Sequence, residues 1–301
     1  MQLVQQMING ITIGAFYSLV ALGYTMVYGV LKLINFAHGD LFMWGAYLGL
    51  TGLTGVLSLF AGTSSLAILP AVILVMVTVA LAGVLVERVA YRPLRSAGRL
   101  APVISALGVA FILQSLARNV FGASYKTYPA GVTPSGGFAI AGAARVSVMQ
   151  IIVLVVSFLL MAALYLFVQR TRVGTAMRAV SLNHDVSRLM GIDVDRIIAI
   201  VFLIGPGLGG VAGMIVALYY GSFDFTLGWV FGLKAFIAAI LGGIGNIPGA
   251  MLGGMLLGII ETLGSGYISP QWKDVIAYLI LILILIFRPT GLLGERVAEK
   301  V

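Results

Sequence analysis

The longest stretches of this sequence carry no charged residue at all. Leu41 to Val86 form one such run of 46 residues, and Met7 to Leu31 form another. A water-soluble domain has about 25% charged residues, whereas this chain has 9% and is 60% apolar. Because a membrane-spanning helix needs about 20 apolar residues, we expect an all-α polytopic membrane protein. The lack of cysteine excludes a disulfide-rich secreted fold.

The apolar runs predict eight or nine spans within one transmembrane domain that covers 1–301. The number depends on a glycine-rich hairpin at 226–263, with its turn at Gly245–Gly249, which either crosses twice or re-enters. Small and polar residues at 62–65 divide the longest run, and Gly205-Pro206-Gly207 interrupts a later span. The expected spans are 7–31, two within 41–86, 101–117, 148–168, 197–220, the two arms of the hairpin, and a last helix from Pro270 to Phe287.

The cations gather in a few connections between the apolar runs. Twelve of the 18 Lys and Arg residues lie in 87–100, 169–196 and 288–301. Since positive residues favour cytoplasmic loops, we expect these segments and the C-terminus inside and the N-terminus outside. The loop 119–146 is then external, either as a plain surface loop or as a docking surface or cap over a pathway. Cations dispersed in this way indicate topology rather than a nucleic-acid groove.

Motifs for catalysis are missing from the sequence. It has no phosphate-binding loop, no His-Glu-x-x-His and no Gly-x-Ser-x-Gly, so we expect no enzymatic activity. His38-Gly39-Asp40 lies at a predicted membrane boundary, but two ligands without a third make no metal site. We expect a satisfied polar cap on the second span. Asn35, His38 and Asp40 are also candidates for a translocation pathway.

Glycine, with 39 residues, is the second unusual feature of the composition. Pairs such as Gly10/Gly14 and Gly254/Gly258 repeat at four-residue spacing, which lines one helix face and permits close backbone packing. Gly205-Pro206-Gly207 differs, because proline frees a backbone group inside the membrane. Such groups are tolerated where protein or a water-filled cavity satisfies them. We interpret these three residues as part of a pathway-lining helix that moves.

Two ionisable residues lie within the hairpin, one on each arm. Lys234 and Glu261 are 12 and 15 residues from Asn246, so their depths differ by only about 4.5 Å at 1.5 Å per residue. Pairing would offset the cost of burying a lysine, roughly 2.5–3.5 kcal/mol at a helix centre. The spacing predicts a Lys234–Glu261 contact with a structural role.

The cytoplasmic loop 169–196 mixes charged and apolar residues. Val186, Leu189 and Met190 follow the i, i+3, i+4 spacing of a helix face. The pattern predicts a short amphipathic helix that ends at Gly191. Its apolar face either lies flat on the membrane or docks into a groove of a cytosolic partner.

Several motifs in order along the chain resemble one family of transporters. Asp185-Val186-Ser187-x-x-x-Gly191 is similar to the Glu-Ala-Ala-x-x-x-Gly coupling motif of ABC importer permeases. The whole chain resembles branched-chain amino acid ABC permeases of the LivH type. The segments that carry this resemblance are Asn9–Gly14, Ala21–Gly29, Ile34–Asp40, Gly174–Ala179, Leu189–Ile192, Gly242–Ala250 and Phe287–Gly294.

The resemblance implies one of two membrane subunits of an ATP-driven importer for leucine, isoleucine and valine. A sister permease, two cytosolic ATPases that use ATP and Mg, and an external binding protein would complete the importer in a bacterial or archaeal inner membrane. This chain would bind membrane lipid but no cofactor. The residues that it implies for ATPase coupling are Asn183, His184, Asp185, Arg188 and Gly191.

Two alternatives stay open at this point. Permeases of the same class carry urea or short amides, and no residue here identifies a leucine pocket. A secondary transporter or channel is the other alternative, although such carriers usually need intramembrane carboxylates. Glu261 is the only deep carboxylate in the expected spans, which favours the importer.

Overall fold

The computed structural model describes residues 2–59, 67–95, 97–98, 100–129, 131–134, 136–140 and 144–294. Within these residues, eight helices are long and apolar enough to cross a membrane, which confirms an all-α polytopic membrane protein. The helices are α1 (Gln2–Leu31), α2 (His38–Leu59), α3 (Ile68–Val86), the π-helical turn η2 (Glu87–Tyr91), the 3-10 turn η3 (Arg92–Leu94), α4 (Leu100–Phe121), α5 (Val148–Arg170), α6 (Arg172–Leu182), α7 (His184–Leu189), α8 (Val194–Tyr220), α9 (Leu227–Gly242), α10 (Ile247–Tyr267), the 3-10 turn η4 (Pro270–Trp272) and α11 (Lys273–Phe287).

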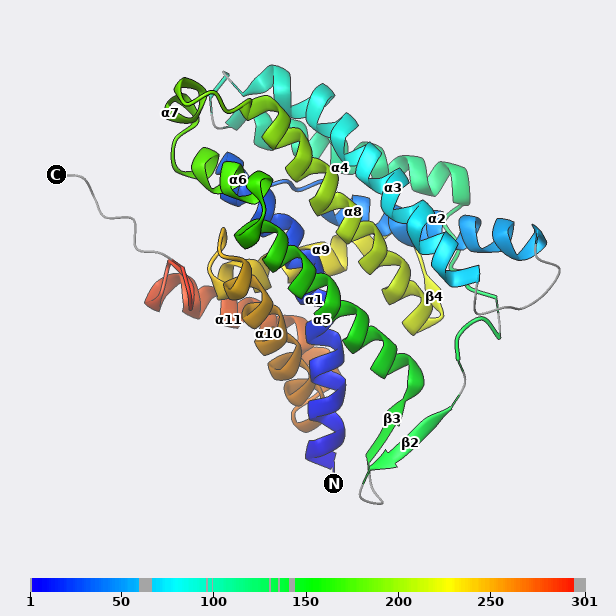
Figure 1. Cartoon of the computed structure of the whole chain (residues 1–301). Helices are drawn as coiled ribbons and strands as arrows, with labels where there is room; N and C mark the ends of the chain where they lie inside the picture. The colour runs from blue at the N-terminus through cyan, green and yellow to red at the C-terminus, as the bar shows by residue number, and fades with distance from the viewer. Residues whose placement is uncertain are drawn as a thin grey trace.

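The bundle has two ends, which are seen at the top and bottom of Figure 1. The α7 end holds α6, α7, the end of α1 and the start of α8. The opposite end, called the β2–β3 end, holds the start of α1 and two antiparallel strands, β2 (Gly137–Ile140) and β3 (Ala144–Ser147). Close to the end of α8, β4 (Ser222–Phe223) pairs with β1 (Lys126–Thr127). The predicted loop 119–146 therefore contains β1, β2 and all but the last residue of β3.

Two helices form the centre of the molecule. Most residues of α1 and α8 are buried, and α1 lies against α10, α8, α9 and α5. At the periphery, α11 has a single buried residue, Ala277. A membrane helix that is apolar on all sides can either be buried among other helices, as α1 and α8 are, or lie at the periphery, as α11 does. Both positions suit it because lipid and the protein interior are equally apolar.

Glycine permits the closest helix contacts, as the four-residue spacing predicts. A Cβ atom on Gly14 of α1 would lie 2.8 Å from the Cα atom of Met255 in α10, and one on Gly258 would overlap the backbone of Gly14. Between α2 and α8, a Cβ atom on Gly45 would overlap the backbone of Gly210. These contacts confirm close backbone packing.

The second span begins inside the bundle instead of at its boundary. Residues 32–37 form no helix, and the chain turns at Lys32, where φ is +56°. His38, the first residue of α2, contacts Gly23 of α1 and Gly209 of α8. Gly23 lies eight residues before the end of α1, about 12 Å along the helix at 1.5 Å per residue. His38 therefore lies inside the helix bundle, fully buried, and not on its surface.

The interruption predicted at Gly205-Pro206-Gly207 is also wrong, because α8 is one continuous helix of 27 residues. Proline removes one N–H donor and leaves the carbonyl of Phe202 without its helical partner. That carbonyl faces Gly83 of α3, where a Cβ atom would overlap both it and the proline ring. Close packing of α3 thus supports the helix through the proline.

Several boundaries differ from the sequence-based expectation, among them the following three. Helix α4 continues past Arg118 to Phe121, since an arginine near the end of a span can extend to the interface. The turn of the 226–263 hairpin is Gly243–Asn246, because Pro248 occupies the first turn of α10, a position that suits proline. Helix α10 continues to Tyr267. The division predicted at 62–65 lies outside the described residues.

The glycine contacts lead to a test of packing. Gly258→Ala should lower the thermal unfolding midpoint of the purified protein, because overpacking costs about 1–3 kcal/mol and the neighbour is backbone. Gly108→Ala in α4 is the matched control, since a Cβ atom there meets nothing within 4 Å; alanine should stabilise that helix by up to about 1 kcal/mol. Equal midpoints for the two variants would contradict the packing explanation.

Candidate functional site

Helix α7 is a short helix with a well-defined start and end. The Asn183 side-chain oxygen accepts hydrogen bonds from the N–H groups of Asp185 at 2.9 Å and Val186 at 3.1 Å, as an N-cap residue does. Gly191, with φ at +80°, ends the helix in the left-handed conformation that glycine adopts readily. The short helix predicted to end at Gly191 is therefore present.

The apolar face of α7 is exposed. Leu189 is 86% exposed, Met190 77% and Val186 53%. On the other side, the His184 ring nitrogen Nε2 hydrogen-bonds the carbonyl of Val30 at 2.8 Å, which ties α7 to the end of α1. The five predicted coupling residues thus lie together, with Arg188 and Asp185 forming an exposed ion pair at 3.5 Å. This arrangement offers an apolar surface on a fixed support.

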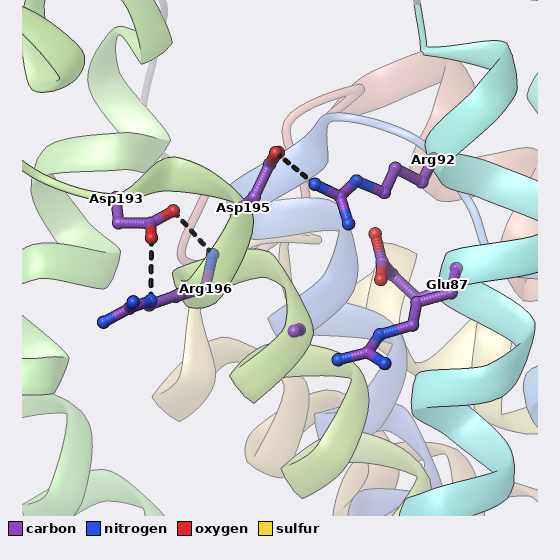
Figure 2. A pocket seen from close by; sticks show the side chains of 7 residues that line it. Glu87, Arg92, Asp193, Asp195 and Arg196 are labelled. Atoms are coloured by element: carbon purple, nitrogen blue, oxygen red, sulfur yellow. Dashed lines mark hydrogen bonds and ion pairs between the residues drawn. The ribbon is translucent and has the colours of Figure 1, made fainter.

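A charged hollow of about 320 Å³ lies beside this segment, between η2 and the start of α8. Figure 2 shows Asp195 pointing toward Arg92 and Asp193 toward Arg196. Arg95 contacts both Asp195, at 2.7 Å, and the buried carboxylate of Glu87. These ion pairs connect the segment after α7 to the end of α3. The sequence interpretation used the arginines of 87–100 only for topology and missed this network.

The polar segment at the start of α2 is buried in the centre of the molecule. Asn35 accepts hydrogen bonds from the Ala37 N–H at 3.1 Å and from the Tyr91 hydroxyl at 3.0 Å. Both ring nitrogens of His38 and one oxygen of Asp40 have no hydrogen-bond partner among the described residues. The predicted satisfied cap is therefore wrong, because α2 starts among helices and away from water.

Gly205, Pro206 and Gly207 lie close to this segment on α8. Gly205 faces Gly23 of α1, and Gly207 faces Ala80 of α3, with Cβ distances of 3.5 and 3.3 Å. Both glycines and the proline are buried. The structure thus brings the two groups of predicted pathway residues onto neighbouring helices in the bundle centre.

The predicted contact between Lys234 and Glu261 is present, with Nζ and Oε1 2.7 Å apart. Two further residues join it: Lys234 lies 2.7 Å from Asp274, and Lys273 lies 3.1 Å from Glu261. Glu261 is fully buried, whereas the Asp274 side chain is 66% exposed. The four charges cancel, and they join α9, α10 and the start of α11. The sequence interpretation missed Lys273 and Asp274, which belong to the last helix.

Part of the 119–146 loop covers the middle of α2. The Tyr128 hydroxyl donates a hydrogen bond to the carbonyl of Ala46 at 2.8 Å, and its side chain is buried. Among the residues that the structure describes, no group of three His, Cys, Asp or Glu side chains could hold a metal ion.

Removing one member of the buried ion-pair network should destabilise the protein. Lys234→Met leaves Glu261 with Lys273 alone, and breaking a buried pair costs about 3–5 kcal/mol. The double variant Lys234→Met/Glu261→Gln should recover part of this loss, measured as the thermal unfolding midpoint in detergent. Lys273→Met, at a partly exposed position, should cost less. A double variant as unstable as the single one would contradict the pairing.

The comparisons with known proteins all concern transport. The model of the family described as the permease component of branched-chain amino acid transport systems matches residues 6–285. The high-affinity branched-chain amino acid transport system permease protein BraD of Pseudomonas aeruginosa is 43% identical, over 99% of this chain and 97% of BraD. LivH of Escherichia coli, with the same description, is 41% identical over the same shares.

A more distant relative is the probable branched-chain amino acid transport permease protein LivM of Methanocaldococcus jannaschii. It is 29% identical over 48% of this chain and 46% of its own length. No solved structure gives a significant match. The family match over most of the chain and the two full-length relatives lead to one conclusion: this chain belongs to the family of permease components of branched-chain amino acid transport systems.

Proposed function

We propose that this chain is a membrane-spanning subunit of an ABC importer that translocates branched-chain amino acids delivered by an external binding protein. The observation that carries the proposal is α7, a capped helix whose apolar face is exposed on a fixed support. The relatives BraD and LivH, described as branched-chain amino acid transport permeases, support the choice of cargo. ATP and Mg would be used by partner subunits.

The proposed orientation places the α7 end in the cytoplasm. Arginines of η2, η3, α6 and α7 gather at this end, and an excess of positive residues favours the cytoplasmic side of a membrane. The N-terminus is then outside and the C-terminus inside an inner membrane. The apolar face of α7 would dock into a groove on one of two cytosolic ATPases.

The proposed complex contains a second permease beside this chain. The relative LivM, whose name describes another branched-chain amino acid permease, supports a sister subunit. The exposed apolar side chains of α3, α4, α5 and α11 would face this subunit and lipid.

In the proposed mechanism, movement of α7 reaches the centre of the bundle by two routes. His184 connects α7 to the end of α1. Asp195, in the first turn of α8, is held by Arg95, which also binds Glu87 at the end of α3. Since α3 and α8 also touch at Gly83 and Pro206, we expect them to move as one body.

The proposed pathway passes the buried polar segment. Asn35, His38 and Asp40 offer unpaired polar groups inside the bundle. Gly205, Pro206 and Gly207 line the neighbouring face of α8. A buried polar group without a partner is costly, which is why we assign these groups to transport rather than to stability.

A charge on the apolar face of α7 should uncouple the importer. Leu189→Asp is expected to weaken retention of the ATPase subunits by about 30-fold, since a central apolar anchor contributes about 2 kcal/mol. Gly191→Pro should have the same effect, because proline cannot adopt φ at +80°. Co-purification and leucine uptake are the measurements.

Leu3→Asp is the matched control for this test. Leu3 is also exposed, but it lies at the start of α1, at the opposite end of the bundle. It should retain the ATPases as the wild type does. Normal uptake in both Leu189→Asp and Gly191→Pro would contradict the coupling role of α7.

The pathway is tested at Asp40. Asp40→Asn keeps the size of the side chain and removes its charge, so the thermal midpoint should stay equal or rise, because a buried carboxylate is costly. Leucine uptake should fall by about tenfold, equivalent to about 1.4 kcal/mol. A variant with unchanged uptake would show that Asp40 takes no part in transport.

A further inference from the structure

A second hollow lies at the end of the bundle opposite α7. It is formed by the end of α8, by β4, by the start of α9 and by Tyr125 of the 119–146 loop. Its volume is about 280 Å³, which is room for about nine water molecules at about 30 Å³ each. Leucine has about as many non-hydrogen atoms. The hollow can therefore accept one small organic molecule.

The walls of this hollow are mainly apolar. Val216, Leu227 and Val230 supply aliphatic surface. Tyr220 and Phe231 add two rings in edge contact, with centroids 6.0 Å apart. Phe231 also stacks on Phe42 of α2 at 5.6 Å, so the hollow adjoins the helix that begins with the buried polar segment. Such walls favour an aliphatic side chain, because removing apolar surface from water is favourable.

One charged side chain, Asp224, lines the hollow. Its Oδ1 atom accepts hydrogen bonds from the Thr226 N–H at 3.0 Å and from the Thr226 hydroxyl at 2.7 Å. These bonds fix the carboxylate, while Oδ2 makes no hydrogen bond with the described residues. No lysine or arginine of the described residues pairs with Asp224. A fixed carboxylate beside aromatic rings is suited to bind a primary ammonium group.

We propose that this hollow is a transient binding site for an aliphatic amino acid, with Asp224 accepting hydrogen bonds from its ammonium group and Val216, Leu227 and Val230 contacting its side chain. This inference rests on the proposed function, because it places the cargo on the face where the binding protein would release it. No cation lines the hollow to hold the cargo carboxylate. We therefore expect weak binding, with a Kd of about 1 mM, as passage through a membrane requires.

The test uses the natural lack of cysteine in this chain. Ser222→Cys places a thiol at the edge of the hollow, and a membrane-impermeant maleimide labels it in right-side-out vesicles washed free of binding protein. With a Kd of about 1 mM, 10 mM leucine should slow labelling about tenfold. The amine 3-methylbutylamine should also protect the thiol, whereas 4-methylpentanoate, which lacks the ammonium group, should not.

Two variants make the result specific. Adding Asp224→Asn to Ser222→Cys should abolish protection by leucine and by the amine. Gln271→Cys, exposed near the start of α11, should be labelled at the same rate with or without leucine.

Four results would each overturn the inference: absence of labelling in the Ser222→Cys variant, absence of leucine protection there, equal protection once Asp224→Asn is added, or equal slowing in the Gln271→Cys variant. Leucine uptake by the wild-type importer tests the proposed function separately. Uptake without protection of the Ser222→Cys thiol rejects only this site, and lack of uptake rejects the proposed function itself.

Discussion

Close contact between helix backbones holds this molecule together. In a membrane, lipid tails are as apolar as the side chains, so helices associate through packing and hydrogen bonds rather than through exclusion of water. Gly14 against Gly258, Gly39 against Gly228 and Gly45 against Gly210 each leave no room for a Cβ atom. The first contact packs α10 against α1, and the other two pack α9 and α8 against α2.

The same packing permits irregular backbone in the middle of the bundle. Residues 32–37 return from the end of α1 into the centre, where α2 starts beside Gly23 and Gly209. Non-helical backbone at this depth requires protein around it, and glycine lets the neighbours come close enough. Pro206 benefits in the same way, since the carbonyl that it frees is covered by α3. The buried polar segment thus depends on small residues elsewhere in the sequence.

Charge is used in two compact networks, one toward each end of the bundle. At the α7 end, Arg95 joins Glu87 of η2 to Asp195 of α8. Toward the β2–β3 end, a second network with zero net charge joins three helices through Lys234, Glu261, Lys273 and Asp274. Each network binds helices that contribute side chains from distant parts of the sequence. Movement at α7 would therefore act on a body whose helices are tied together at both ends.

The sequence by itself determined the features that depend on local order. Apolar length predicts the spans, the spacing of Val186, Leu189 and Met190 predicts α7, and similar distance from Asn246 predicts the Lys234–Glu261 contact. The family resemblance is also carried by motifs in order along the chain, and the comparisons bear it out.

Only the tertiary structure decided the features that depend on neighbouring helices. The depth of His38 follows from Gly23 and Gly209, which lie on other helices, and the continuity of α8 through Pro206 follows from Gly83. Lys273 and Asp274 join the ion-pair network because α11 packs on α9 and α10, the two arms of the 226–263 hairpin. A pattern in sequence specifies which face of a helix is small, apolar or charged. It does not specify which other helix meets that face, since lipid and protein interior reward apolar surface equally.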